Sequence, residues 1–177
     1  MLDFYKHEIT PGEYKPYFSG YIDLTSKESF PVQMEKNTGL VRDLYERMNE
    51  NKLSYRYAES KWTLAEVIGH MLDTERIMCY RALRIARGDK TPLPGFEQDD
   101  YVLNGPFARY RKDDILMEYT AVRLATATFF EYLSREELAS TGVVDMHPVS
   151  VRAIAFIILG HELHHYNTIM EKYLLKK

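Results

Sequence analysis

Four segments of helical length, separated by clusters of glycine and proline, constrain the fold of this 177-residue chain more than any other feature. Within each segment, apolar residues recur at intervals of three and four, which places them on one face of an α-helix. The segments span about residues 32–51, 63–88, 113–133 and 149–175. No stretch shows the strict alternation of apolar and polar residues that is typical of a half-buried strand. We therefore expect an all-α protein, an antiparallel four-helix bundle.

Three of the four helices carry a start signal. Pro31 suits the first turn of the first helix, because the N–H that proline lacks has no partner there. Thr63 and Glu66 form the capping box T-x-x-E directly before the second apolar run. Asp113 or Asp114 is the expected cap of the third helix.

Two regions outside these helices are long. Residues 1–30 are aromatic and irregular, with Pro11, Gly12 and Pro16 as breakers, and we expect them to form an arm packed on the bundle. Residues 89–112 form a connection long enough to cross from one end of a bundle to the other. The length of the chain suits a single domain over residues 1–177 that includes this arm.

The composition excludes several functions. With 26 acidic and 23 basic residues, the chain has a formal net charge of −3 and no basic stripe, which argues against nucleic-acid binding. The longest apolar run, residues 153–159, is far too short to span a membrane, and we read no signal peptide. The single cysteine, Cys79, excludes an intrachain disulfide and is expected to be a core residue. These features indicate a cytoplasmic protein.

The histidines are the residues that suggest chemistry. His161 and His165 lie one turn apart on the apolar stripe of the last helix, so both imidazoles can reach one metal ion. His70 lies at the edge of the stripe on the second helix, at a similar depth in the bundle. His164 points away from this pair. Three neutral imidazoles would hold a divalent ion and leave one position open.

Two other interpretations exist for these residues. Each histidine could simply be a hydrogen-bonded core residue. The sequence from His161 to His165 also matches H-E-x-x-H, the zinc-protease motif in which Glu162 would be the general base. Thr168 and Glu171 occupy the glycine and histidine positions of the extended motif, and no substrate-binding sheet is expected upstream. These differences argue against a protease.

Three stretches together resemble the DinB/YfiT-like superfamily of metal-binding four-helix bundles. They are the segment K-W-T-L-A-E-V-I-G-H that ends at His70 with the following D-T-E-R at 73–76, then L-P-G-F at 93–96, and finally G-H-E-L-H-H at 160–165. The resemblance implies a metal site in which the second helix supplies His70 and the last helix supplies His161 and His165. Zinc or nickel would be the main candidates for the ion, with manganese and iron as further candidates.

The same resemblance implies the kind of activity. Members of the superfamily include thiol-dependent S-transferases, a thiol-dependent isomerase and proteins described as metal-dependent hydrolases, are often homodimers, and indicate a bacterial source. We therefore expect a small-molecule substrate, with a low-molecular-weight thiol as a candidate partner. Glu162 is the candidate catalytic residue, as a proton acceptor. A stress-related metal-binding protein without turnover and a purely structural bundle stay open as alternatives.

Glu75 is the second carboxylate of interest, because its helical position lies within the apolar stripe. An unpaired buried charge would be costly there. We expect Glu75 to pair with an arginine such as Arg76 or Arg81, from a neighbouring helix or subunit, rather than to act in catalysis.

Overall fold

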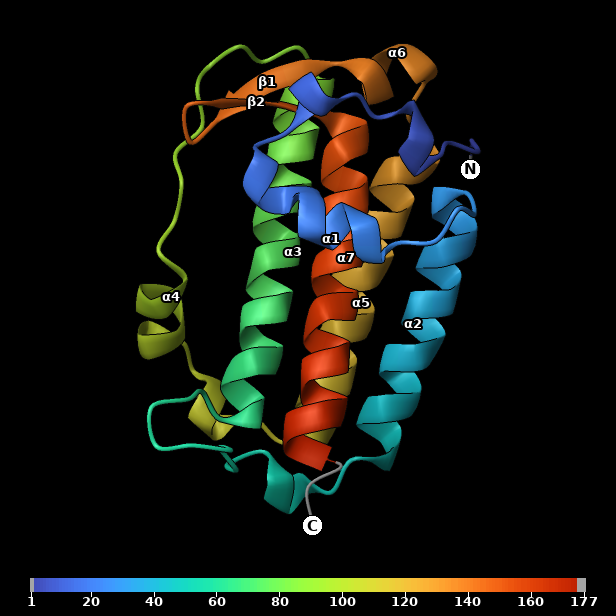
Figure 1. Cartoon of the computed structure of the whole chain (residues 1–177). Coiled ribbons are helices and arrows are strands. Elements are labelled where there is room, and N and C mark those ends of the chain that lie inside the picture. The colour runs from blue at the N-terminus through green and yellow to red at the C-terminus, as the bar shows by residue number, and fades with distance from the viewer. Residues whose placement is uncertain (1, 175–177) are drawn as a thin grey trace.

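The computed structural model describes residues 2–174, and four long helices form its body (Figure 1). They are α2 (Phe30–Arg47), α3 (Leu64–Ala86), α5 (Lys112–Glu131) and α7 (Val151–Thr168). The predicted all-α four-helix bundle is thereby confirmed. None of the described helices is both long and apolar enough to cross a membrane.

The crossover connection gives the bundle its topology. After α3 the chain returns along the outside of the bundle, so that α5 starts at the same end as α3 (Figure 1). As a result α3 and α5 run in the same direction, whereas α7 runs opposite to α3. Helix α3 packs against α7 and α5, and α2 packs against the same two helices from the other side. The faces of α3 and α7 that carry the histidines therefore meet.

The start signals are largely confirmed. The Thr63 hydroxyl accepts a hydrogen bond from the Glu66 amide at 3.2 Å, and the Glu66 carboxylate accepts one from the Thr63 amide at 2.6 Å. Pro31 lies in the first turn of α2. Helix α5 begins slightly earlier than predicted, because Arg111 is its N-cap and Asp114 accepts from the Arg111 amide at 3.2 Å.

The last helix changes character near its end. Helix α7 is followed without a break by a π-helical turn, Ile169–Leu174. The predicted end of this helix, residue 175, lies outside the described residues.

Short elements occupy the regions that were expected to be irregular. The arm contains the 3₁₀ turns Lys6–Glu8, Pro11–Glu13 and Pro16–Phe18, and then the short helix α1 (Ser19–Leu24). The crossover contains α4 (Gln98–Asn104) and the 3₁₀ turn Phe107–Arg109. A further 3₁₀ turn, Glu50–Lys52, follows α2, and α6 (Arg135–Ala139) follows α5.

The expectation of no strand was wrong at one place. β1 (Thr141–Val144) and β2 (His147–Ser150) form an antiparallel hairpin. Its two-residue turn has positive φ at Asp145 (48°) and Met146 (62°), the backbone of a type I′ turn without its usual glycine. Leu93 of the crossover extends the sheet, since its amide donates to the Val143 carbonyl at 2.9 Å. The hairpin thus fixes the crossover over one end of α3.

The core consists of two apolar clusters with a polar layer between them. One cluster contains Phe4, Phe30, Phe130 and Phe156, and the other contains Tyr45, Leu64, Ile68, Ile115 and Tyr119. All four long helices carry buried polar residues between the two clusters. These residues are Asn37 on α2, His70, Thr74 and Glu75 on α3, Arg123 and Thr126 on α5, and His161 and Glu162 on α7. A buried polar layer of this size requires internal partners or a ligand.

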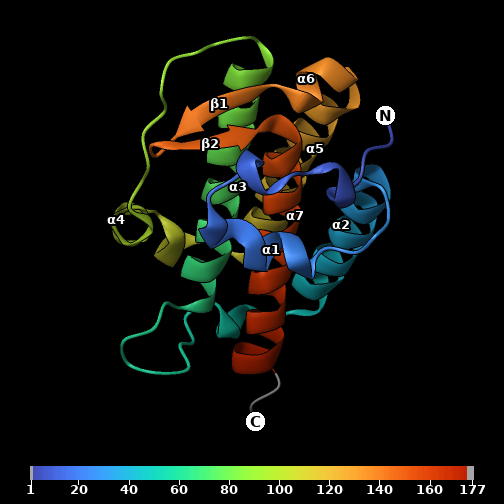
Figure 2. The ribbon, with the colours of Figure 1, turned by 45° about the horizontal axis from the view of Figure 1, so that its top comes forward.

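The arm docks across α7 at the level of this layer. Figure 2 shows α1 lying over the middle of α7. A Cβ atom added to Gly160 would lie 1.9 Å from the Tyr21 carbonyl oxygen, so this approach requires glycine. The arm is also anchored by Glu13, which is 8% exposed and accepts from Arg152 Nε at 2.7 Å. The arm therefore contacts α7 both through the close approach of Tyr21 to Gly160 and through the pairing of Glu13 with Arg152.

Candidate metal centre

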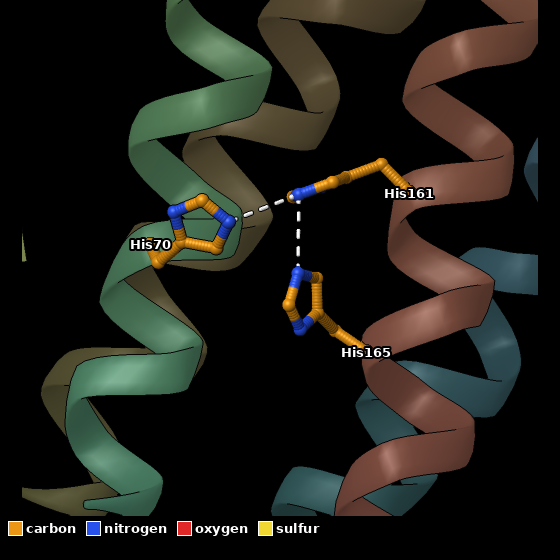
Figure 3. Close-up of side chains that lie close together, drawn as sticks. All are labelled: His70, His161 and His165. Atoms are coloured by element: carbon orange, nitrogen blue, oxygen red, sulfur yellow. Dashed lines mark hydrogen bonds between the residues drawn. The ribbon is translucent and has the colours of Figure 1, made fainter. Parts of the chain in front are cut away.

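The three predicted histidines converge in the space between α3 and α7 (Figure 3). His161 Nε2 lies 3.0 Å from His70 Nε2 and 3.1 Å from His165 Nε2. One ring nitrogen from each residue lies within 4.8 Å of the other two. Among the described residues, this is the one such group of potential metal ligands that the structure contains. His70 and His161 are 91 residues apart in the chain, yet their rings point at one another from two different helices.

This arrangement fits a divalent ion. Zinc–imidazole bonds of about 2.0–2.1 Å at tetrahedral angles separate two nitrogens by roughly 3.3 Å. The two nitrogen separations of 3.0 and 3.1 Å are close to that value. Hydrogen bonding alone explains the geometry less well, because a neutral imidazole has one N–H and all three Nε2 atoms face inward. The donor set therefore suits a borderline ion such as zinc or nickel.

The histidines are held in the neutral form that metal binding requires. Burial lowers the pKa of His70 to about 4, against a smaller opposing effect of Asp99. Burial lowers the pKa of His165 to about 3, and His70 adds to the shift. The pKa of His161 is also well below its ordinary value, because the ring is desolvated and faces the other histidines. Near pH 7 each ring nitrogen that lacks a proton is available as a ligand.

Aromatic rings surround the histidines. Tyr21 of the arm meets the His161 ring edge-on, with centroids 5.4 Å apart. Trp62, just before α3, lies 5.0 Å from the His70 ring. His164 is exposed and contacts Tyr21 and His165 by ring edges, but it does not belong to the converging group. The separation of His164 from the other three agrees with its predicted helical angle.

A second polar cluster lies on the other side of His161. Arg123 of α5 is 3% exposed and donates to Glu75 Oε2 at 2.8 Å and to Glu162 Oε1. The Tyr119 hydroxyl donates to the same Glu162 oxygen at 2.9 Å. Burial by itself would lower the pKa of Arg123, but the two carboxylates outweigh it and raise the pKa. Burial raises the pKa of Glu162, with Arg123 acting in the opposite direction.

The buried pairing predicted for Glu75 is present, but its partner differs. Glu75 pairs with Arg123, whereas Arg76 pairs with Glu118 at 2.7 Å. Arg81, the other predicted partner, donates to the Pro94 carbonyl at 2.8 Å. The prediction named arginines close in sequence, because the parallel packing of α5 on α3 could not be read from the chain.

A cleft of about 340 Å³ opens beside the histidines. His70 and His161 line it from α3 and α7, and Tyr17 and Tyr21 line it from the arm. The crossover contributes residues 95–98 and the hairpin contributes residues 144–145 and 147–149. The volume lies in the range of small-molecule sites. The arm, the crossover and the hairpin thus build the walls of a site whose potential metal ligands come from the bundle.

The sequence did not assign four residues to the roles that they have in this region. Tyr21, Arg81 and His147 line the cleft, and Arg123 holds the second cluster. The motif L-P-G-F at 93–96 was the available signal for Arg81, because Pro94 and Phe96 contact it directly.

A sequence comparison decides the family. The profile of the DinB superfamily matches residues 33–169. This chain belongs to the DinB superfamily. The matched region starts in α2 and ends at the close of α7, so it contains all three histidines.

Individual relatives agree with this assignment. The chain is 23% identical over 135 residues to an Oceanobacillus iheyensis protein named "Putative metal-dependent hydrolase OB0413", with 75% of this chain and 77% of that protein covered. Among solved structures it is similar to YfiT from Bacillus subtilis, described as "a probable metal-dependent hydrolase with an unusual four-helix bundle topology". That match has a TM-score of 0.70 and 16% identity, and it covers 91% of this chain and 92% of YfiT.

A further similar structure is that of an enzyme with a different activity. The mycothiol-dependent maleylpyruvate isomerase matches with a TM-score of 0.67 and 9% identity, over 93% of this chain and 62% of the isomerase. At such identities the two structural matches establish the shared fold.

Proposed function

We propose that this protein is a metal-dependent enzyme acting on a small molecule, with His70, His161 and His165 as ligands of one divalent ion. The observation that carries this proposal is the convergence of three ring nitrogens beside a cleft of about 340 Å³. When bound, an ion with three protein ligands and an open position supplies Lewis acidity, which lowers the pKa of a coordinated water or thiol. Zinc and nickel fit the donor set best.

The chain itself supplies orientation and shielding. His161 and His165 come from one helix turn, so their separation is fixed by α7, and His70 closes the site from α3. Tyr21 and Trp62 limit the access of water to the imidazoles. The cleft brings a substrate to the side of the site that His70 and His161 line.

Two reactions fit this site, hydrolysis and transfer to an external thiol. Hydrolysis is supported by the names of two relatives, and thiol chemistry by the mycothiol-dependent isomerase. The single cysteine cannot serve as the thiol, because Cys79 is outside the cleft lining and burial raises its pKa. Any thiol must therefore enter as a co-substrate.

The catalytic role of Glu162 stays a prediction. Its carboxylate is 4% exposed and accepts hydrogen bonds from Tyr119 and Arg123. Together with His161 it lines a cavity of about 10 Å³ between the two polar clusters. Glu162→Gln keeps the size of the side chain but removes the proton acceptor. A lower kcat at unchanged metal content would support a catalytic role, and an unchanged kcat would reject it.

The experiment that tests the proposed function combines metal analysis with turnover. The protein is loaded with zinc, nickel or manganese and incubated with thiols plus electrophiles, and separately with esters and amides. We expect one metal per chain and a rate that is lost in His161→Ala but kept in His164→Ala, the matched control outside the group. Metal without a histidine-dependent rate would instead favour a non-catalytic metal-binding protein. A wild-type protein that binds no stoichiometric metal would contradict the proposal and favour a structural bundle.

We further propose a homodimer from a bacterium, as the resemblance implies, and a location in the cytoplasm, as expected from the single cysteine and the short apolar runs. Large apolar side chains such as Met117, Leu124 and Tyr132 are exposed along α5 and just after it. Sedimentation that gives only the 20.8 kDa monomer at high concentration would reject the dimer.

A further inference from the structure

Arg81 is a buried cation that lines the cleft without a carboxylate in direct contact. It lies on α3, is 6% exposed and lines the same cleft as His70. Its Nη2 atom donates to the Pro94 carbonyl at 2.8 Å, and Nη1 donates weakly to the Met78 sulfur at 3.7 Å. The guanidinium carbon lies 5.5 Å from the centre of the Phe96 ring. Arg81 forms no ion pair with any residue between 2 and 174.

The other buried arginine, Arg123, differs from Arg81 because it forms ion pairs. Arg123 is the second arginine that is buried in the described chain, and it contacts two carboxylates. A buried arginine that lacks such a partner retains a large desolvation cost. Burial accordingly lowers the pKa of Arg81, although an arginine stays protonated at neutral pH. The fold therefore keeps a charge in the cleft that a ligand can neutralise.

Neighbouring acidic residues offset the charge of Arg81 only from a distance, since Asp145 favours the charged form of Arg81 without forming an ion pair with it. Asp145 of the hairpin is paired with Lys15 at 2.9 Å. Glu97 lines the cleft but is exposed, so its charge is solvated and screened. Of the five N–H donors of a guanidinium, the contacts with Pro94 and Met78 occupy two, which leaves donors for an incoming anion.

The contacts of Arg81 also fix its orientation. Pro94 and Phe96 belong to the crossover, which Leu93 attaches to the hairpin through hydrogen bonds of 2.9 and 3.0 Å. Gly95 packs so closely that an added Cβ would lie 3.2 Å from Asp145 Oδ1. A guanidinium held between a carbonyl and an aromatic face is pre-organised for a planar carboxylate.

His70 and Arg81 lie on the same face of α3. They are separated by 11 residues, about three turns, which corresponds to roughly 16 Å along the helix axis. Helical side chains tilt toward the N-terminus, so the Arg81 side chain leans toward His70. The cleft that both residues line therefore has a metal-binding end and a cationic end.

We propose that the substrate of this cleft carries a carboxylate that binds Arg81, while its reacting group lies at the histidine site. This inference rests on the proposed metal-dependent function and adds the chemical class of the substrate. The reacting group and the carboxylate are separated by an extended linker, because the two ends of the cleft lie several helix turns apart.

The test compares matched ligands on the zinc-loaded protein. Monohydroxamates of the dicarboxylic acids from succinic to suberic acid bind zinc at one end and carry a carboxylate at the other. Their terminal carboxamides are the neutral controls. Charge-assisted hydrogen bonds predict that the carboxylate of the best length binds about tenfold or more tightly than its amide in calorimetry.

Variants locate this preference. Arg81→Gln should remove the preference for the carboxylate and leave the affinity for the amide and the zinc content unchanged. Arg87→Gln, on the exposed end of the same helical region, should keep it. Equal wild-type affinities for acid and amide at every length would overturn this inference, while the proposed metal function would stand. The wild-type comparison decides the question even if Arg81→Gln does not fold. Absence of zinc binding would overturn both proposals.

Discussion

Two consecutive residues of α7 belong to two polar clusters of opposite character. His161 belongs to the histidine cluster, in which three neutral rings face one another beside an open cleft. Glu162 belongs to the ionic cluster, in which Arg123, Glu75 and Tyr119 are buried with it. The ionic cluster has its main partners within the chain. The histidine cluster brings together three ring nitrogens whose lone pairs can bind one metal ion.

The comparison separates stability from function. The ionic cluster links α3, α5 and α7 through buried ion pairs, and removing one partner would leave the others buried without it. An open cluster of neutral imidazoles is instead explained by what it binds. The two clusters should therefore respond differently to mutation, and the following changes test that difference.

The largest effect is expected from Arg123→Met. The substitution leaves Glu75 and Glu162 buried without their cation, and we expect a loss of about 3–5 kcal/mol in the free energy of unfolding. Urea denaturation of the metal-free protein near pH 7 measures it.

Arg76→Met is the matched control on α3. Arg76 pairs with Glu118 but its side chain is 46% exposed, so we expect a loss under about 1 kcal/mol. Similar losses for both variants would mean that the ionic cluster does not stabilise the fold in the way proposed.

Gly160→Ala should lower the free energy of unfolding by about 3 kcal/mol, which is less than the loss expected from Arg123→Met. The added Cβ would lie 1.9 Å from the Tyr21 carbonyl oxygen, so α1 must move away from α7. Because Tyr21 covers His161, the variant should also make the histidine cluster more accessible while the ionic cluster stays intact.

Limited proteolysis of the arm together with thermal unfolding measures this effect. Gly20→Ala is the control, since nothing lies within 4 Å of an added Cβ there. An arm that is as protected in Gly160→Ala as in the wild type would show that α1 does not depend on this close approach.

The sequence predicted the histidine cluster better than the ionic cluster for a physical reason. His161 and His165 are related by one helical turn, and His70 shares their depth in any antiparallel pairing of α3 with α7. Arg123 depends on the parallel packing of α5 against α3, which follows from the path of the crossover in space. No local pattern along the chain determines that path.

The walls of the cleft were harder to predict than its histidines. The hairpin turn at Asp145 and Met146 has positive φ but lacks the Asn-Gly type of signature, and each strand has only four residues. The contact of the arm with α7 depends on Gly160, whose role requires the three-dimensional structure.

The pH dependence of the metal-free protein gives a third contrast, of about 3 kcal/mol for one histidine. The folded pKa of His70 is about 4, below the ordinary value of 6.5. Between these values the unfolded chain binds a proton that the folded chain excludes, so stability falls as the pH drops from 6.5 toward 4. His70→Gln should show a weaker fall over this interval in urea denaturation. Identical pH profiles for the variant and the wild type would indicate that His70 is not held in the neutral form.

The most direct test of the central claim is the position of a bound metal. Crystals of the zinc-loaded protein, measured at the zinc absorption edge, should show one anomalous peak per chain, bonded to the Nε2 atoms of His70, His161 and His165 at about 2.0–2.1 Å. The peak should leave one position open toward the cleft. A peak bound through His164 or the ionic cluster, or no peak at all in crystals of the loaded protein, would contradict the account.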